Sequence, residues 1–274
     1  MPSVYEIITQ KIISKLEAGT GAWRKPWNNY QAVNWQSQRP YRGINTMLLN
    51  QGEYATFKQI SEVGGKVKKG QKANLVVFWK WIVKEDQKTG EKEEFPLLRY
   101  YNVFEINTQC EGLQSKREAK EFQHNPIEEA EQIKEGYRDG PPLSFGPGRA
   151  YYRPSTDTIS IPPLKDYEKP EEYYSTMFHE MIHSTGHVSR LKRPGITQSN
   201  SFGSEPYSKE ELIAEMGAAM LCGVTGIDNS TLDNSASYIA SWLRKLKEDS
   251  RLVVIAAAQA QKAADYIQGI EHEG

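Results

Sequence analysis

The sequence predicts an α+β protein in which a strand-rich first part is followed by a helix-rich second part. The first part contains two runs of β-branched and aromatic residues, 74–83 and 97–106, on either side of the charged segment EDQKTGEKEE. Such a pair is typical of a β-hairpin with a long tip. The second part contains a short hairpin pattern and then four helical patterns, which is the element order of an α+β domain.

The elements that precede the hairpin follow from local signals. Ser3 and Glu6 have the spacing of a capping box, and apolar residues then recur at every fourth position up to Leu16. Residues 20–45 are rich in aromatic and loop-forming residues. A short helix is expected over Tyr54–Val63, because the two glycines that follow Val63 can end it.

A polar and charged stretch, CEGLQSKREAKEFQHN, separates the two parts. We therefore expect a first domain over residues 1–112, a linker over 113–127 and a second domain over 128–274. The second domain begins with a predicted helix at Pro126–Glu135 and a hairpin that turns at residues 154–157. The four predicted helices that follow are Pro170–Thr185, Lys209–Val224, Thr231–Asp249 and Ser250–Gln268.

The charge of the chain is divided unevenly between the two parts. The formal net charge is only −1, but residues 1–83 carry 12 Lys and Arg against 4 Asp and Glu, and residues 113–274 carry 18 against 24. A basic region that also contains stacking side chains indicates nucleic-acid binding.

Other bulk features predict a cytoplasmic protein without a membrane partner. No apolar run reaches the roughly 20 residues that a bilayer-spanning helix needs, and the first residues lack the pattern of a signal peptide. Cys110 and Cys222 are far apart in the sequence and are expected to be reduced thiols.

The stretch FHEMIHSTGH, residues 178–187, contains the pattern H-E-x-x-H within a predicted helix. His179 and His183 are four residues apart, so they lie on one helical face and can turn ring nitrogens toward the same ion. Glu180 lies beside them, where a carboxylate can accept a proton from the attacking water. The pattern predicts two metal ligands, His179 and His183, and a catalytic base, Glu180.

A catalytic zinc site of this kind needs a third protein ligand. His187 is four residues after His183, but Gly186 is expected to end the helix before it, so we predict an outer position for His187. The metzincin pattern would need a histidine at Ser189 and fails there.

The helix KEELIAEMGAAML, residues 209–221, provides the predicted third ligand. Glu211 and Glu215 lie on one helical face among small residues that allow close helix packing, an arrangement that resembles the gluzincin pattern. We assign Glu211 as the ligand and Glu215 as the carboxylate that orients a ligand histidine. The reverse assignment is left open. For Thr158–Ile161 two possibilities are left open: a sheet edge beside the site, to which an extended substrate could add as a strand, or an ordinary strand of the sheet.

The basic part of the sequence combines cationic and aromatic residues. Proteins that bind single strands pair a cationic groove with aromatic side chains on which bases stack. About half of the aromatic residues on the predicted hairpin must face a core, so no single aromatic residue indicates binding. The evidence for nucleic-acid binding is the combination of aromatic residues with net positive charge. The predicted nucleic-acid-binding residues are Trp23, Arg24, Lys25, Trp27, Tyr41, Arg42, Lys66, Lys68, Lys69 and Lys72.

The motifs also resemble a known family. KIISKLEAGTGAWRKPW, RPYRGIN, TFKQISEVGGKVKKGQKA and VFEINTQCEGL resemble the N-terminal domain of ArdC-type antirestriction proteins, and FHEMIHSTGH with KEELIAEMGAAML resembles the zincin-like metallopeptidase domain that follows it. The resemblance covers nearly the whole chain. It implies an N-terminal α+β domain that binds single-stranded DNA, before a mostly helical, gluzincin-type hydrolase domain with a small antiparallel sheet.

The function that the resemblance implies is the protection of incoming plasmid DNA from host restriction during conjugation. Zn²⁺ is the expected ion, with Mn²⁺ or Co²⁺ as alternatives, and the expected partners are single-stranded DNA and a protein substrate in the restriction system. Whether the domain cleaves any protein is left open. One alternative is a DNA-binding protein with a structural, proteolytically silent metal site. Another is a zinc peptidase whose basic domain recruits a protein substrate.

Overall fold

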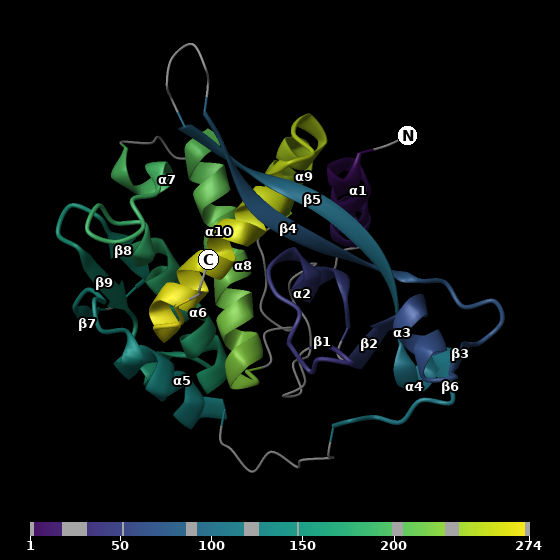
Figure 1. Ribbon diagram of the computed structural model, residues 1–274. Helices are drawn as coiled ribbons and strands as arrows, with labels where there is room; N and C mark the ends of the chain where they lie inside the picture. Colours follow the sequence, from purple (N-terminus) through teal and green to yellow (C-terminus); the bar gives the residue numbers. More distant parts are fainter. Residues whose placement is uncertain are drawn as a thin grey trace. The chain divides into compact units, whose positions relative to one another are not determined.

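The structure is a computed structural model that describes residues 3–17, 32–50, 52–85, 92–117, 126–146, 148–198, 205–227 and 236–271 (Figure 1). Its contacts divide the chain into two compact units, Met1–Lys11 with Gln31–Lys120 and Ile12–Tyr30 with Glu121–Gly274. The fold is α+β, as predicted. The linker expected at residues 113–127 stays a prediction.

The first helix, α1 (Val4–Glu17), begins at the predicted capping box. The backbone N–H of Glu6 donates to Ser3 Oγ at 3.2 Å, and the backbone N–H of Ser3 donates to the Glu6 carboxylate. Ile12 and Leu16 are buried on the apolar face of the helix. The sequence pattern therefore fixes both the start of α1 and the face that it buries.

The first unit contains a four-stranded sheet with strand order β1-β2-β5-β4. The predicted hairpin is confirmed, because β4 and β5 pair antiparallel over their full length (Figure 1). Both strands are longer than expected, and residues 86–91 between them lie outside the described residues. The strands are β1 (Ala32–Asn34), β2 (Gly52–Thr56), β4 (Asn74–Glu85) and β5 (Lys92–Glu105).

The helix expected over Tyr54–Val63 is wrong in its first part. Tyr54, Ala55 and Thr56 belong to β2 and pair with β5, and only Phe57–Glu62 forms the helix α3. The Thr56 side chain accepts a hydrogen bond from the backbone N–H of Gln59, which sets the true helix start. The small elements of this unit are α2 (Ile44–Leu48), β3 (Lys66–Val67), α4 (Ile106–Gln109) and β6 (Cys110–Glu111).

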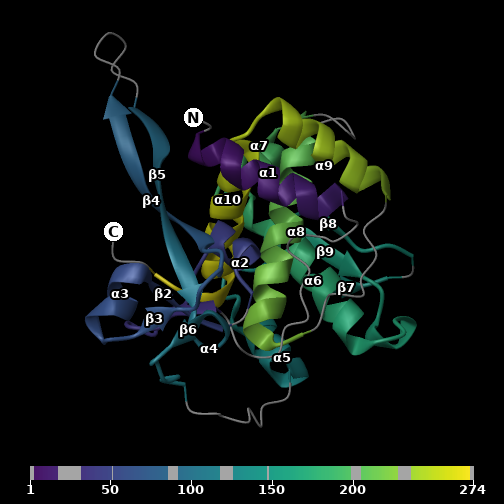
Figure 2. The same cartoon turned by 90° about the vertical axis from the view of Figure 1, so that its right-hand side faces the viewer.

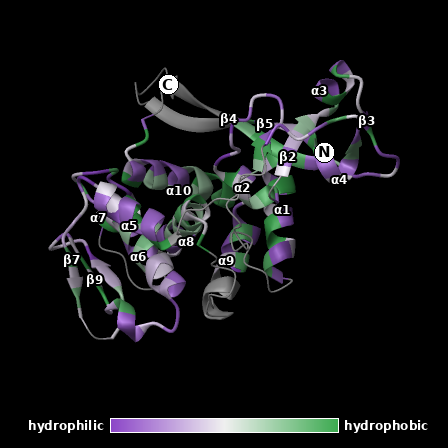
Figure 3. Cartoon of the chain, turned by 90° about the horizontal axis from the view of Figure 1, so that it is seen from below, coloured by the Kyte–Doolittle hydropathy of each residue, from purple (hydrophilic) through white to green (hydrophobic). Residues whose placement is uncertain are grey.

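The core of the first unit lies where β2, β4 and β5 meet. Tyr54, Val76 and Val103 are buried together there, and Figure 3 shows hydrophobic residues in this region. Trp35 belongs to a second buried cluster, and its indole N–H donates to the Gln114 carbonyl at 2.9 Å. This tryptophan is therefore a core residue rather than a stacking surface.

The second unit contains a three-stranded sheet of order β7-β9-β8. The expected hairpin is confirmed, since β8 (Tyr151–Arg153) and β9 (Thr158–Ile161) pair antiparallel. Of the two possibilities left open for Thr158–Ile161, the edge strand is wrong, because β7 (Leu143–Phe145) pairs with it in parallel on the other side. The small sheet is therefore mixed, not purely antiparallel, and β9 is its central strand.

The helices of the second unit pack around α8, which contacts both α6 and α10 (Figure 2). The four predicted helices are confirmed. α6 has the expected bounds, α8 and α10 differ from the expected ones at their ends, and residues 231–235, expected at the start of α9, lie outside the described residues. None of the helices in the described ranges is long and apolar enough to cross a membrane. Cys110 and Cys222 are buried, and neither forms a disulfide. The helices are α5 (Pro126–Gly136), α6 (Pro170–Thr185), α7 (Pro194–Thr197), α8 (Glu205–Thr225), α9 (Ala236–Glu248) and α10 (Leu252–Gln268), with a 3₁₀ turn at Leu164–Asp166.

Candidate metal centre and nucleic-acid interface

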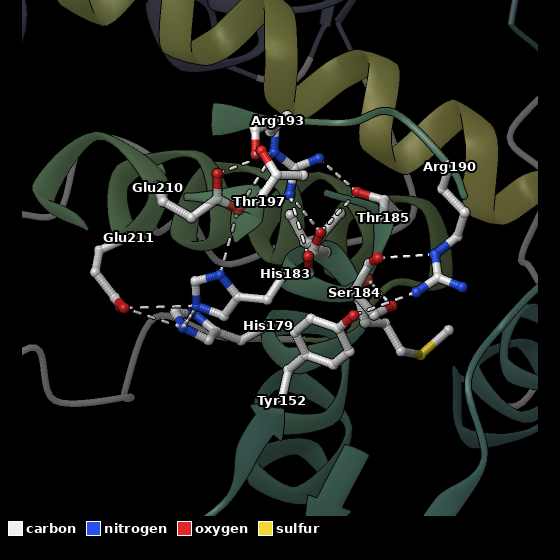
Figure 4. Close-up of polar contacts among 12 residues, drawn as sticks. Tyr152, His179, His183, Ser184, Thr185, Arg190, Arg193, Thr197, Glu210 and Glu211 are labelled. Carbon is white, nitrogen blue, oxygen red and sulfur yellow. Dashed lines mark hydrogen bonds and ion pairs between the residues drawn. The ribbon is translucent and has the colours of Figure 1, made fainter. Parts of the chain in front are cut away.

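The helix α6 places two histidines one turn apart. Pro170 begins the helix and Gly186 is its C-cap, as the sequence predicts. His179 and His183 face each other across this turn, with their Nε2 atoms 3.0 Å apart (Figure 4). At Gly186 an added Cβ would lie 2.6 Å from Ile196, so the chain can turn closely here only without a side chain.

The helix α8 brings Glu211 to the same point. One oxygen of its carboxylate lies 3.5 Å from His179 Nε2, and the other lies 3.6 Å from His183 Nε2. The potential ligand atoms of His179, His183 and Glu211 all lie within 4.8 Å of one another. The structure therefore brings together the three side chains that the sequence analysis selected as ligands (Figure 4).

Each histidine also has a carboxylate on the opposite side of its ring. Oε1 of Glu215, the predicted orienting carboxylate, lies 3.6 Å from His179 Nδ1. Glu210 Oε1 lies 3.4 Å from His183 Nδ1, and the sequence analysis did not select it. Because both Nδ1 atoms face a carboxylate, both Nε2 atoms are turned toward Glu211 and toward each other.

Glu210 is balanced by a buried arginine. The Glu210 and Arg193 side chains are only 4% and 5% exposed, and the guanidinium reaches both carboxylate oxygens, at 2.6 and 3.0 Å. Burial alone would raise the pKa of Glu210, but the His183 hydrogen bond and the Arg193 charge outweigh it and hold the pKa below its usual range. A signal existed in the sequence, because Glu210 is seven residues before Gly217 and so shares the face of α8 that packs closely.

The carboxylates also change the proton affinity of His179. Burial by itself would lower its pKa, but the hydrogen bond with Glu211 and the charges of Glu215 and Glu180 raise it to about 9. The arrangement therefore attracts positive charge to the space between the two Nε2 atoms.

Glu180, the predicted base, lies beside this cluster. Its side chain is buried, and it lines a cavity of about 1000 Å³ together with His179, His183 and Glu211. The strand β8 forms another wall of the cavity through Tyr151 and Tyr152. A small or extended substrate could therefore reach Glu180 and the histidine pair from the same space.

His187 lines the same cavity but has different partners. Its Nδ1 lies 2.8 Å from Ser189 Oγ and 3.9 Å from Asp157 Oδ2. Its expected role as an outer group of the metal centre stays a prediction.

A second buried arginine joins the hairpin to the end of α6. Arg190 Nε donates to the Ser184 carbonyl at 2.8 Å (Figure 4). Its guanidinium forms an ion pair with Asp157, which also accepts the hydroxyl proton of Tyr152. Burial alone would raise the pKa of Asp157, but Arg190 and Tyr152 lower it. This network fixes β8 and β9 beside the histidines.

The predicted nucleic-acid residues fall into three groups. Lys66, Lys69 and Lys72 are exposed, and the Lys68 ammonium donates to the Thr108 carbonyl at 3.1 Å. Tyr41 and Arg42 are half-buried, and the ring of Tyr41 packs edge-on against Tyr54 with centroids 6.3 Å apart. Outside the described residues lie Trp23, Arg24, Lys25 and Trp27.

The β4–β5 hairpin has an exposed aromatic face, whose residues are not among the predicted nucleic-acid-binding residues. Phe78 is 59% exposed and pairs directly with Arg99, and Tyr101, which is 47% exposed, follows on the same face. The alternation of the strands could have predicted that these residues share a face. It could not predict that the covered part of the sheet ends before them.

Two family models match the chain. The N-terminal domain of anti-restriction factor ArdC matches residues 2–104, and the zincin-like metallopeptidase matches residues 130–259. The metal-free crystal structure of the antirestriction protein ArdC from plasmid R388 has a TM-score of 0.74 to this structure, with 37% identity and coverage of 98% of both chains. This chain belongs to the ArdC family of antirestriction proteins.

Other relatives extend the comparison of this ArdC-family chain. The Mn(II)-bound structure of R388 ArdC has a TM-score of 0.77, with 36% identity over 98% of both chains. An uncharacterised protein, y4eC, of Sinorhizobium fredii is 32% identical, with 96% of this chain and 91% of that protein aligned. Two DNA primases named TraC from Escherichia coli are 34% and 33% identical over 98% of this chain, but the chain spans only 20% and 27% of their length.

Proposed function

We propose that this ArdC-family protein binds single-stranded DNA through its first unit and carries a divalent-metal peptidase site in its second unit. The observation that carries the proposal is the convergence of His179, His183 and Glu211 at a cavity that Glu180 also lines. The DNA would be incoming plasmid DNA, protected from restriction in the cytoplasm during conjugation, and the peptide substrate would belong to the restriction system.

The donor set fits a divalent metal. Two imidazole Nε2 atoms 3.0 Å apart present lone pairs to each other when the protons are on the Nδ1 atoms, which face the carboxylates of Glu210 and Glu215, and a cation between them relieves the repulsion. His179, His183 and Glu211 would hold the ion. Two nitrogens and one carboxylate are typical zinc ligands, and the Mn(II)-bound R388 relative supports Mn²⁺ as the alternative.

When bound, the metal would polarise the scissile carbonyl and acidify the attacking water. Glu180 accepts the proton of that water on its carboxylate and later delivers it to the leaving amine. The carboxylates of Glu210 and Glu215 face the two Nδ1 atoms and favour the tautomer that carries its proton there. A structural metal site needs no such base. The buried Glu180 therefore favours a peptidase over the alternative of a structural metal site without proteolytic activity.

DNA binding is supported by the surface of the first unit. Its exposed lysines can contact phosphates, and the face of Phe78, Arg99 and Tyr101 presents aromatic rings beside a guanidinium, which suits the stacking of unpaired bases. Stacking accepts every base, so we expect affinity with weak sequence preference.

Replacement of Lys66, Lys69 and Lys72 by glutamine is expected to weaken binding and to reduce its salt dependence. Each phosphate contact on a single strand contributes about −0.7 to the slope of log K against log[salt], so loss of three contacts reduces the slope by about 2. Fluorescence anisotropy of a labelled single-stranded oligonucleotide across a salt series measures this slope.

The matched control replaces three lysines of the second unit, each of which is ion-paired: Lys134, Lys245 and Lys247. The change in net charge is the same, but the slope should stay that of the parent. Equal losses in both variants would contradict the assignment of these contacts. If the parent protein binds no DNA even at low salt, the alternative in which the basic unit recruits a protein substrate is supported.

A further inference from the structure

His183 differs from His179 in the way its outer carboxylate is supported. Its partner Glu210 is almost completely buried, with a side chain 4% exposed, and a buried carboxylate needs a partner that balances its charge and fixes its orientation. Glu215, which faces His179, is 24% exposed, so water can solvate it. The orientation of His183 therefore depends on a second buried group.

Arg193 is that group. Its Nε lies 3.0 Å from Glu210 Oε2 and its Nη2 lies 2.6 Å from Oε1, so the planar guanidinium contacts both oxygens of the carboxylate. The remaining donors bind the end of α6, with Nη1 2.6 Å from Thr185 Oγ1 and Nη2 2.7 Å from the Ile182 carbonyl. One guanidinium therefore ties Glu210 on α8 to the helix that carries His183 (Figure 4).

The backbone after α6 fits this arginine closely. The N–H of Arg193 donates to the Gly186 carbonyl at 3.0 Å, and a Cβ at Gly186 would lie 3.1 Å from Arg193 Nη2. Glu210 and Glu211 are consecutive on α8, so the same turn of helix contacts His183 at Nδ1 and at Nε2. A rotation of Glu210 would therefore disturb the imidazole that Glu211 also faces.

We infer that Arg193 is a positioning residue of the metal centre, which acts through Glu210 to hold the His183 imidazole with its Nε2 lone pair turned toward His179 and Glu211. This inference rests on the proposed metal site. It assigns to Arg193 a role in metal affinity although the residue does not contact the metal-binding atoms.

The test measures the affinity of the metal-stripped full chain for Zn²⁺ by competition with a chelating dye, and the Co²⁺ absorption spectrum of the loaded protein. Loss of an outer-sphere partner typically weakens metal binding by about 10–100-fold, and we expect this loss for Arg193→Met, with a changed Co²⁺ spectrum. Arg193→Lys keeps the charge without the planar fork and should lose roughly 10-fold, which keeps the test valid if the methionine variant does not fold.

The matched control is Arg190→Met. Arg190 lies on the same loop, its side chain is 3% exposed, and it also binds a carbonyl at the end of α6, but its ion pair is with Asp157. We expect Arg190→Met to lower thermal stability and to keep the metal affinity of the parent. Equal weakening of metal binding by the two variants would overturn the inference and indicate a general effect on the end of the helix.

A double-variant comparison tests the route through Glu210. Because Arg193 acts on His183 through the carboxylate, Arg193→Met should weaken metal binding in the parent and change it little in a Glu210→Gln background. Fully additive losses would overturn the inference. A parent protein that binds no metal would overturn the proposed function itself, so the two failures are distinguishable.

Discussion

Glu180→Gln is expected to bind a divalent metal as tightly as the parent protein and to hydrolyse peptide bonds about 10²–10⁴ times more slowly. Glutamine has nearly the shape of glutamate, so the buried position beside the cavity stays filled. It cannot accept a proton from the attacking water. Metal content by mass spectrometry and cleavage of fluorescently labelled, unfolded casein measure the two properties separately.

Two further variants define the meaning of this result. Glu172→Gln removes a carboxylate from the first turn of the same helix, away from the cavity, and should leave both properties unchanged. His183→Ala removes one of the three converging groups and should lose metal and hydrolysis together. A Glu180→Gln protein that loses its metal would show that Glu180 is a ligand, and equal cleavage rates would show that it is not the base.

The sequence predicts the centre of the site because helical spacing is local. Two histidines four residues apart in a helix must lie on one face, whatever the rest of the fold does. The capping box at Ser3 and the C-cap at Gly186 are local in the same sense, and the structure confirms both. The choice of Glu211 over Glu215 used the family pattern, and the two carboxylates are near different ring nitrogens of His179.

The remaining part of the site depends on contacts between distant segments. Arg193 lies in a loop, and nothing in its neighbourhood indicates that its guanidinium reaches Glu210 on another helix. The strand β7 has three residues, too few to show an alternating pattern, and its pairing with β9 decides between the sheet edge and the ordinary strand that the sequence left open. Tyr54–Thr56 fits a helix or a strand equally, and pairing with β5 decides it. Local patterns predict most helices and strands. Where a segment suits either, its pairing with a distant segment decides which one forms.

The second large effect is expected for Gly217→Val, which should lower the free energy of unfolding and weaken metal binding together. At Gly217 an added Cβ would lie 2.6 Å from Ile182 Cδ1 and 2.8 Å from Cγ1, and Ile182 is completely buried between α6 and α8. Overpacking of this kind typically costs about 1–3 kcal/mol. Thermal unfolding of the metal-free protein and a Zn²⁺ titration provide the measurements.

The expected loss of metal affinity follows from the position of the contact. Ile182 is the residue before His183, so separating α8 from α6 at this point moves Glu211 away from the histidines. Gly136→Ala is the control, because an added Cβ at this helical glycine meets no atom within 4 Å and should leave stability unchanged or higher. Ile182→Ala combined with Gly217→Val moves apolar volume across the interface, so the pair should cost less than the sum of the two changes. Additive costs would show that the close approach at Gly217 does not hold the two helices of the site together.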